Sequence, residues 1–558
     1  MSYDPTNPLI VQSDRTVLLE TDNDQFEEAR DELSKFAELV KSPEHIHTYR
    51  VTPLSLWNAA ALGYSPNEVK DQLRTFSKYE VPDNLLEDID DFMDRYGRIK
   101  LVADGDNLYL VSADRALLTE IAQNDEIEDL IAGRTSEGRL KIKQGERGMV
   151  KHALIQIGYP VEDLAGYEEG DPLDIALREE TREGSEFGLR EYQNEAVDAF
   201  WAGGTERGGS GAIVMPCGAG KTIVALGSMA EAEAHTLILC TNVTDLRQWR
   251  EEILDKTTVD PDLVGEYSGE TKEIKPITLT TYQILTYRKD KDAEFKHFDI
   301  FNEANWGLII YDEVHLLPAP VFRAVANLQS RRRLGLTATL VREDGKEDEV
   351  FSLIGPKKYD VPWRVLEKKG FIATAKCAEK RVPFRDDELR LKYALADPRE
   401  KYKLAATNPA KLDIVQRLLN QHKDDQVLVI GQYLDQLDQI SEMFDAPIIT
   451  GRTKQEERDV LYADFRTGEV PVLVVSKVAN FAVDLPDANV AIQVSGTFGS
   501  RQEEAQRLGR ILRPKEDGNQ AHFYSVVTRD STEQEYSYKR QLFLTEQGYR
   551  YHIETYDE

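Results

Sequence analysis

A glycine-rich turn followed by lysine and threonine is the first feature of this sequence that could do chemistry. It lies in the stretch GAIVMPCGAGKT, between an apolar run that predicts a strand and a helix predicted to begin near Thr222. The two glycines of GAGK allow the backbone to turn its N–H groups toward a polyphosphate. Lys221 is placed to reach the β- and γ-phosphates, and the Thr222 hydroxyl is placed to ligate Mg²⁺.

The strict form of this loop has glycine where this chain has Met215, so only the shorter Gly-x-Gly-Lys-Thr form is present. The alternative, an accidental match in an unstructured loop, is disfavoured by the flanking strand and helix. We predict that the polyphosphate contacts Pro216, Cys217, Gly218, Ala219, Gly220, Lys221 and Thr222.

An acidic pair follows a second apolar run, in the stretch LIIYDEVHLL. The run predicts a strand that delivers Asp312 and Glu313 at its carboxyl end, where the ligand sites of parallel sheets lie. Asp312 is suited to hold Mg²⁺ through water, and Glu313 is suited to orient and polarise an attacking water. A strand-end acidic pair beside a packed His315 is the alternative, which the upstream Lys221 loop disfavours. The two stretches together predict binding and hydrolysis of a nucleoside triphosphate.

A glutamine lies upstream of the glycine-rich turn, in the stretch GLREYQNEAV. Gln193 precedes Lys221 by 28 positions, with Arg190 close by. A glutamine amide can read the edge of adenine through two hydrogen bonds, which selects ATP. An exposed glutamine on a helix surface is the alternative. We predict ATP and Mg²⁺ as the cofactors, with Arg190 and Gln193 in contact with the adenine base.

Arginines recur near the C-terminal end, in the stretch SRQEEAQRLGRILRP. Arg507, Arg510 and Arg513 are spaced by three, so on a helix they share one face. Guanidinium groups on that face could stabilise the charge that develops at a γ-phosphate. We predict Gln506, Arg507 and Arg510 as catalytic residues; a salt-bridged helix surface is the alternative, which the scarcity of acidic partners after Gln506 disfavours.

The elements that must position these residues form two series of short apolar runs alternating with helical segments. The first series contains GAIVMP, TLILCT, ITLTTY, WGLIIYD and RRLGLTAT. The second begins near Asn408 and contains QVLVIGQY, APIITG, PVLVVSK, ANVAIQVSG and AHFYSVV. Such alternation predicts parallel sheets covered by helices on both faces. The predicted fold class is therefore α/β, with two tandem doubly wound lobes.

The remaining third of the chain precedes the lobes. Residues 1–100 are predicted to be mostly helical. The sequence Ser65-Pro66-Asn67-Glu68 marks a helix start, which gives either a helix-turn-helix-like unit or a plain helical hairpin. Residues 101–170 predict a small α/β or α+β domain. Polar and acidic residues at 171–187 predict a linker. The lobes are predicted at 188–365 and 410–558, with a connector at 366–409.

Composition limits the class of protein. Hydrophobic residues make up 41% and charged residues 30% of 558, which is typical of a soluble globular chain of several domains. The three cysteines show neither metal-ligand nor disulfide spacing, and no secretory signal or membrane-crossing run is apparent, so we expect a reduced cytoplasm and no membrane partner. The formal charge of −31 disfavours polyanions on average, although local basic clusters decide phosphate affinity. The acidic excess fits either solubility or adaptation to salt.

As a set, the motifs resemble those of superfamily 2 helicases over residues 187–530. The resemblance includes PCGAGKT, DEVH, the triplet Thr337-Ala338-Thr339 and QRLGRILR. It implies two RecA-like lobes with the triphosphate between them, and nucleic acid crossing both. It further implies that Thr337 and Thr339 link the triphosphate site to the strand-binding face, and that Asp484 contacts the ribose, although the glycines usual around Asp484 are replaced here.

Further features resemble the XPB branch of that superfamily. These are the charged triplet Arg342-Glu343-Asp344 after TAT, the DEVH box, CTNVTDLRQWREE and the N-terminal stretches NPLIVQSDRTVLLE and SPEHIHTYRVTPLSLWNAA. The resemblance implies that the charged triplet acts as a wedge that opens duplex DNA. It also implies a damage-recognition domain at 101–170 and a thumb-like helical insertion within 366–409; a connecting helical hairpin is the alternative for the insertion.

The resemblance implies an ATP-dependent 3′–5′ DNA helicase, in DNA repair, with DNA as its sequence-independent partner and a separate nuclease or repair protein as a further one. An RNA-acting helicase and a non-motor scaffold switched by ATP are the alternatives. A restriction-type translocase is disfavoured because the chain lacks a nuclease motif of the Pro-Asp…Glu-x-Lys kind.

Overall fold

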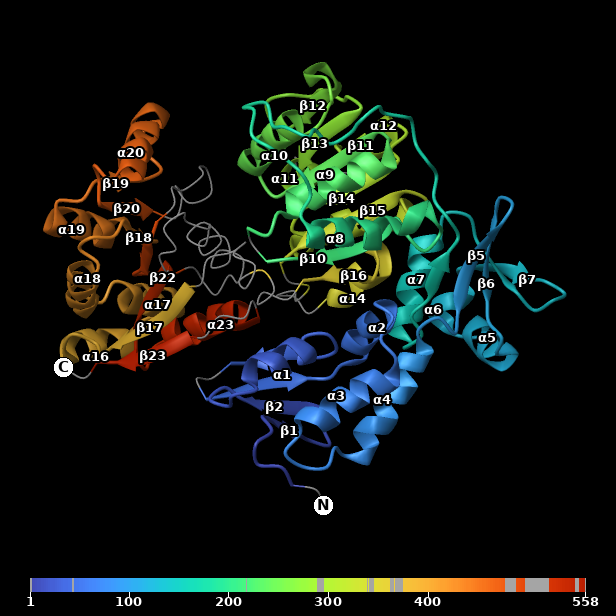
Figure 1. Cartoon of the computed structure of the whole chain (residues 1–558), viewed down its shortest axis with the longest axis horizontal. Coiled ribbons are helices and arrows are strands. Elements are labelled where there is room, and N and C mark those ends of the chain that lie inside the picture. The colour runs from blue at the N-terminus through green and yellow to red at the C-terminus, as the bar shows by residue number, and fades with distance from the viewer. Residues whose placement is uncertain are drawn as a thin grey trace. The chain divides into compact units, whose positions relative to one another are not determined.

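The structure is a computed structural model of the whole chain (Figure 1). It describes residues 3–42, 45–216, 218–288, 296–338, 340, 346–361, 366, 375–476, 488–496, 521–546 and 551–556. The chain forms two compact units. The first comprises Met1–Glu38, Thr48–Met215 and Gly220–Val361, and the second comprises Leu39–His47, Pro216–Ala219 and Pro362–Glu558. No helix in the described ranges is long and apolar enough to cross a membrane.

The first predicted lobe is built on a parallel sheet. In the described part of the chain it has seven strands, in the order β12-β13-β11-β14-β15-β10-β16. Every predicted strand of the first series is present, which confirms the α/β class for this lobe. The strands are β10 (Ser210–Val214), β11 (Thr236–Cys240), β12 (Val264–Tyr267), β13 (Ile277–Thr281), β14 (Leu308–Tyr311), β15 (Arg332–Thr337) and β16 (Lys357–Asp360). The helices are α8 (Glu191–Trp201), α9 (Lys221–Ala232), α10 (Val243–Lys256), α11 (Tyr282–Leu285), α12 (Ile300–Glu303), α13 (Ala319–Asn327) and α14 (Glu347–Glu349), followed by the π-helix η4 (Val350–Ile354).

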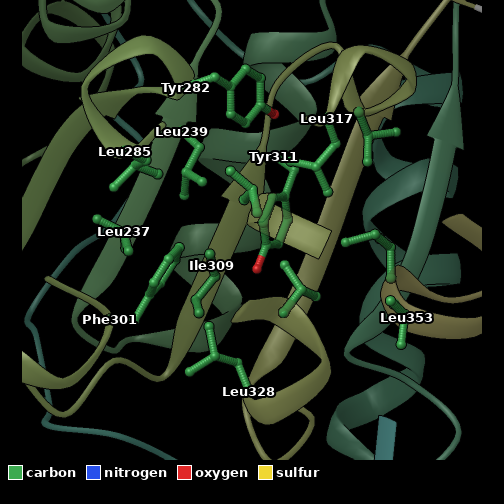
Figure 2. Close-up of a cluster of buried hydrophobic side chains, with 14 of the residues drawn as sticks. Leu237, Leu239, Tyr282, Leu285, Phe301, Ile309, Tyr311, Leu317, Leu328 and Leu353 are labelled. Carbon is green, nitrogen blue, oxygen red and sulfur yellow. The ribbon is translucent and has the colours of Figure 1, made fainter. Parts of the chain in front are cut away.

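Burial explains why these strands are apolar along their whole length. All residues of β11, β13 and β14 are buried, as expected for a sheet with both faces covered. Figure 2 shows one side of this core, where Leu239, Ile309 and Tyr311 meet side chains that follow the strands, such as Leu317 and Leu328. The sheet is thus a rigid base for the loops at its carboxyl edge.

The N-terminal hundred residues differ from the prediction of a mostly helical domain. They contain a four-stranded sheet of the order β1-β2-β4-β3 in the described ranges, besides four helices. The prediction missed the strands because they are short, with only every second side chain of β2 buried. The predicted turn between two helices is confirmed: at the start of the helix after the turn, the Ser65 hydroxyl accepts from the Glu68 N–H, and the Glu68 carboxylate accepts from the Ser65 N–H. The elements are β1 (Leu9–Val11), β2 (Thr16–Glu20), α1 (Phe26–Leu33), β3 (Glu38–Lys41), β4 (Ile46–Arg50), α2 (Pro53–Ala61), α3 (Pro66–Phe76) and α4 (Asp83–Arg95).

Residues 100–164, where the sequence predicts a small mixed domain, contain strands and helices, with the sheet order β7-β8-β6-β5-β9. Its strands are β5 (Lys100–Asp104), β6 (Asn107–Val111), β7 (Ile131–Arg134), β8 (Leu140–Ile142) and β9 (Glu162–Leu164), and its helices are α5 (Arg115–Ala122), α6 (Asp125–Glu128) and α7 (Arg147–Gln156).

A buried charge network joins this small domain to the first lobe. Asp163 accepts hydrogen bonds from Arg147 at 2.8 Å and Lys151 at 2.9 Å, and Lys151 also donates to Gln329 of the lobe at 2.9 Å. Burial lowers the pKa of Lys151 to about 8 although Asp163 opposes this effect. Buried charges need such complete pairing, so the network fixes how α7 sits on the lobe.

The predicted linker is not a free connection. Between residues 168 and 178 its backbone is hydrogen-bonded along the lobe: Leu173 N donates to Glu233 O at 2.8 Å, and Arg178 N donates to Lys256 O at 2.9 Å. Leu173 and Ile175 are buried. We name residues 168–178 the strap. The prediction relied on polar composition and missed this because the strap's bonds come from main-chain groups, which composition does not report.

The second unit contains the second parallel sheet, which has seven strands in the described ranges, in the order β19-β20-β18-β21-β22-β17-β23. The sheet begins at β17, before the predicted start near Asn408, and the helices α16 and α17 are inserted after that strand. The strands are β17 (Ala375–Val382), β18 (Val427–Gly431), β19 (Ile448–Ile449), β20 (Val472–Ser476), β21 (Val490–Gln493), β22 (Ala521–Thr528) and β23 (Tyr551–Thr555). The helices are α16 (Asp387–Leu395), α17 (Pro398–Ala406), α18 (Ala410–Gln421), α19 (Leu434–Phe444), α20 (Gln455–Thr467) and α23 (Thr532–Glu546).

The contact between α7 and α13 generates the first testable prediction. A Cβ atom at Gly148 would lie 2.4 Å from Ala326 O, so Gly148→Ala must push the two helices apart. Overpacking of this kind costs about 1–3 kcal/mol. We expect a lower urea midpoint for Gly148→Ala, with faster amide exchange in α7. Gly133→Ala is the matched control in the same domain, because its Cβ would meet nothing within 4 Å. Equal stability of the two variants would contradict the docking described above.

Candidate active site

The glycine-rich turn lies at the carboxyl edge of the first sheet, as the sequence predicts. Met215, directly after β10, donates a backbone hydrogen bond to Thr337 O at 2.9 Å. Gly218 and Gly220 have φ values of +81° and +85°, which glycine adopts at little cost. The helix α9 then begins at Lys221. This is the strand–turn–helix geometry that aims backbone N–H groups at an anion.

Lys221 contacts the acidic pair directly. Its Nζ donates to Glu313 Oε1 at 2.8 Å, and the two side chains are only 12% and 15% exposed. Glu313 has a φ of +46°, an uncommon conformation for a residue with a side chain. Strained backbone is found at functional sites, where the surrounding structure holds it in place. The structure therefore joins the two predicted motifs through one ion pair.

Asp312 is held by hydrogen bonds from two sides. Trp249 Nε1 donates to Asp312 Oδ2 at 2.9 Å, and the Glu313 N–H donates to Oδ1 at 3.0 Å. The Tyr282 hydroxyl donates to the Asp312 carbonyl at 2.8 Å. These contacts leave the Asp312 side chain with one orientation.

The two carboxyls differ in proton affinity. Burial, together with the neighbouring Glu313 charge, raises the pKa of Asp312 to about 7. Burial also disfavours the Glu313 carboxylate, but the Lys221 ammonium outweighs it and lowers the pKa of Glu313. Two adjacent carboxyls with opposite shifts are typical of functional sites.

His315 connects the acidic pair to the next strand. Its Nδ1 lies 2.8 Å from Thr337 Oγ1 and 3.5 Å from Glu313 Oε2. Thr337, predicted as a linking residue, is fully buried at the end of β15. His315 therefore bridges Glu313 and Thr337.

Gln193 lies beside the glycine-rich turn and is buried, not on an exposed helix surface. A Cβ at Gly220 would be 2.4 Å from Gln193 Nε2, so its amide packs on the loop backbone. Its Oε1 accepts from the Arg190 backbone N–H at 2.9 Å, at the start of α8. The structure thus brings Arg190, Gln193 and the loop together.

The sequence reasoning missed the residues that orient Asp312. Tyr282 is the first residue after β13. In the sheet order β13-β11-β14 the end of β13 lies two strands from Asp312, so the available signal was the position of Tyr282 directly after a strand. Trp249 lies further along α10, and only the packing of that helix brings it to Asp312.

Several predicted site residues lie outside the described residues. They are Cys217, Thr339, Arg342, Glu343, Asp344, Asp484, Gln506, Arg507 and Arg510. Their roles stay predictions.

The donor set fits a magnesium ion that is shared with phosphates. Asp312 supplies a carboxylate and Thr222 a hydroxyl, both oxygen donors of the kind that Mg²⁺ prefers. No group of three or more His, Cys, Asp or Glu side chains that could hold a metal occurs within the described ranges. Few protein ligands are typical of nucleotide-bound Mg²⁺, which also takes waters and phosphate oxygens.

The raised pKa of Asp312 predicts a pH effect on stability. Between about 3.9, its usual unfolded value, and about 7, the folded chain holds a proton that the unfolded chain has lost. The free energy of unfolding therefore falls as pH rises through this window. Between pH 5 and pH 8, we expect the Tm of Asp312→Asn to fall several degrees less than the Tm of the wild type, as measured by thermal unfolding. An unchanged pH dependence would show that Asp312 is ionised at neutral pH.

Family models match three ranges of the chain, and curated relatives match nearly its full length. Residues 366–558 match the model of the ERCC3/RAD25/XPB C-terminal helicase, residues 186–342 that of the type III restriction enzyme res subunit, and residues 9–136 that of a helicase conserved C-terminal domain.

The DNA 3′-5′ helicase XPB of Mycobacterium tuberculosis is 54% identical over 552 residues, which cover 99% of this chain and 98% of the relative. Its counterpart in Kineococcus radiotolerans is 52% identical, with 99% and 97% covered. The general transcription and DNA repair factor IIH helicase/translocase subunit XPB of Encephalitozoon cuniculi is 35% identical, with 99% and 83% covered. With the two parallel sheets and the Lys221–Glu313 site already in place, this similarity shows that the chain belongs to the XPB family of ATP-hydrolysing DNA helicases.

Proposed function

We propose that this chain hydrolyses ATP with Mg²⁺ to move 3′ to 5′ along DNA and open the duplex, in DNA repair. The observation that carries the proposal is the cluster of Lys221, Asp312 and Glu313 at the carboxyl edge of the first sheet. The relatives named DNA 3′-5′ helicase XPB support the polarity and the substrate, and the relative named as a subunit of a DNA repair factor supports the pathway.

The Lys221–Glu313 ion pair suggests how binding could prepare hydrolysis. Lys221 cannot keep this contact at full strength while it also neutralises a γ-phosphate. As the ammonium turns toward the phosphate, Glu313 loses the charge that lowers its pKa and becomes a better proton acceptor for the attacking water. Asp312 and Thr222 would hold Mg²⁺, which neutralises phosphate charge when bound. Pro216, Cys217, Gly218, Ala219 and Gly220 would line the phosphates, with Arg190 and Gln193 at the adenine.

The second lobe and the loop after β15 would complete the reaction. Gln506, Arg507 and Arg510 would face the γ-phosphate, and Asp484 would contact the ribose. Thr337 and Thr339 would pass the state of the site to the DNA face, with the His315–Thr337 contact as the first step of that path. The triplet 342–344 would act as the wedge.

DNA contacts of such a motor should be largely to phosphates, so binding should be independent of sequence and should weaken with salt. The chain's charge of −31 makes local basic clusters necessary for that grip. The proposal also includes a separate nuclease or repair protein as a partner and a cytoplasmic location.

Lys221→Ala is expected to abolish ATP turnover, because it removes the phosphate-binding ammonium. Turnover is measured with DNA, with RNA and without nucleic acid, and we expect the wild type to respond to DNA. Lys100→Ala is the control, since it removes an equal charge from a half-exposed lysine in the small domain. If RNA but not DNA stimulated ATP turnover by the wild type, the substrate would be RNA. Full ATP turnover by Lys221→Ala would show that the glycine-rich loop is not part of the active site.

Arg342→Ala is expected to reduce strand displacement on forked DNA, with 3′ and 5′ tails, more than it reduces ATP turnover. A wedge acts at the fork, while hydrolysis occurs at the nucleotide. Arg247→Ala is the matched control, an arginine of the first lobe that is 62% exposed and pairs with Glu270 on the surface. Equal loss of both activities would remove the wedge assignment.

A further inference from the structure

The backbone of Asp312 is fixed on both sides of the residue. The Asp312 N–H donates to Leu239 O at 3.0 Å, so the residue still belongs to the sheet although β14 ends at Tyr311. Its carbonyl accepts from the hydroxyl of the buried Tyr282 at 2.8 Å. With both backbone groups bound, the carboxylate can change its orientation only through the two side-chain torsions of Asp312.

These two torsions are fixed by one hydrogen bond to each carboxylate oxygen. Oδ1 accepts from the N–H of the adjacent Glu313 at 3.0 Å, and Oδ2 accepts from Trp249 Nε1 at 2.9 Å. Within the described ranges, Trp249 is the only residue of another element that donates a hydrogen bond to this carboxylate. A carboxylate has about four lone-pair sites, so these two bonds leave room for a metal ion or for the waters of that ion.

Trp249 is itself held firmly by its helix. Leu246, Trp249 and Ile253 are buried, and their spacing of three and four places them on one face of α10. The start of α10 is capped, because Asn242 Oδ1 accepts from the Asp245 N–H at 3.0 Å. Asn242 follows closely on β11, the strand beside β14. The indole N–H therefore comes from a helix that is fixed relative to the sheet.

The rigidity of an oxygen ligand distinguishes Mg²⁺ from a larger divalent cation. Mg²⁺ demands near-ideal octahedral geometry, whereas Ca²⁺ accepts roughly six to eight oxygen ligands in flexible arrangements. A carboxylate with one fixed orientation therefore favours Mg²⁺, while a carboxylate that can turn serves Ca²⁺ equally well.

We propose that Trp249 is a positioning residue that makes the ATP site select Mg²⁺ over Ca²⁺, by holding the Asp312 carboxylate in one orientation. The inference rests on the proposed function, because it concerns the metal ion that is bound together with the nucleotide. Without the indole N–H, the Asp312 side chain can turn, and the site loses its preference for the ion with the stricter geometry. Binding with Ca²⁺ tolerates a turned carboxylate and should change little.

The test measures nucleotide binding instead of turnover. The Kd of the fluorescent nucleotide N-methylanthraniloyl-ADP is determined for the full chain in Mg²⁺, in Ca²⁺ and in EDTA. For the wild type we expect tighter binding in Mg²⁺ than in Ca²⁺. For Trp249→Phe we expect the Kd in Mg²⁺ to rise about tenfold, as is typical when a residue that orients a metal ligand is removed, with changes below about twofold in Ca²⁺ and in EDTA.

Trp306→Phe is the matched control. Trp306 is a buried tryptophan of the same lobe, and its Nε1 donates to Ile300 O at 2.9 Å. Both variants lose one buried indole N–H, but the Trp306 N–H is bonded to a main-chain carbonyl, so Trp306→Phe should keep the wild-type ratio of the two Kd values. The ratio is independent of stability, because unfolded chains bind no nucleotide and enter neither Kd.

The outcomes separate this inference from the proposed function. A wild type that binds no nucleotide under any of the three conditions would overturn the proposed function itself. With nucleotide bound, equal Kd values of the wild type in Mg²⁺ and Ca²⁺, or an unchanged ratio in Trp249→Phe, would overturn the selective role of Trp249. A similar rise of both Kd values in Trp249→Phe would also overturn it, since the indole would then only stabilise the site. An equal change of the ratio in Trp306→Phe would assign the effect to the loss of any buried indole.

Discussion

The contact on which the rest of the first lobe depends is the ion pair between Lys221 and Glu313. A parallel sheet places the ends of β10 and β14 on one edge, with β15 between them, so a lysine after one strand can meet a carboxylate after the other. The pair lies in a mostly buried setting, where an unpartnered charge is costly. It keeps both groups ionised and within reach of a bound phosphate. Strand order, loop conformation and the strained backbone of Glu313 all serve this one juxtaposition.

The sequence predicted the parts of the fold whose signals are local. Runs such as TLILCT and QVLVIGQY became fully buried parallel strands because no polar residue interrupts them, and the glycine-rich turn carried its own backbone signature. The N-terminal strands were missed because half of their side chains face outward. The strap was missed because its partners are main-chain groups that lie 60 residues away for Leu173 and 78 residues away for Arg178.

The sequence likewise predicted only part of the candidate site. Residue types and spacing predicted Lys221, which ends a glycine-rich turn after an apolar run, and Asp312 and Glu313, which follow another apolar run. Spacing could not show that Trp249 orients Asp312, or that Gln193 is buried against Gly220, because both facts arise from helices packing across the sheet edge. Nor could it show that the pKa values of the acidic pair move apart, which results from burial combined with one nearby cation.

The strap determines where the chain can be cut to isolate the first lobe. The match to the res-subunit model begins at residue 186, yet the strap already covers Glu233 and Lys256 between residues 168 and 178. A fragment that begins at residue 186 would leave the carbonyls of Glu233 and Lys256 without their partners in the strap and would expose the surface that Ile175 covers. The smallest autonomous version of this lobe must therefore start upstream of residue 168, inside what motif comparison alone would discard.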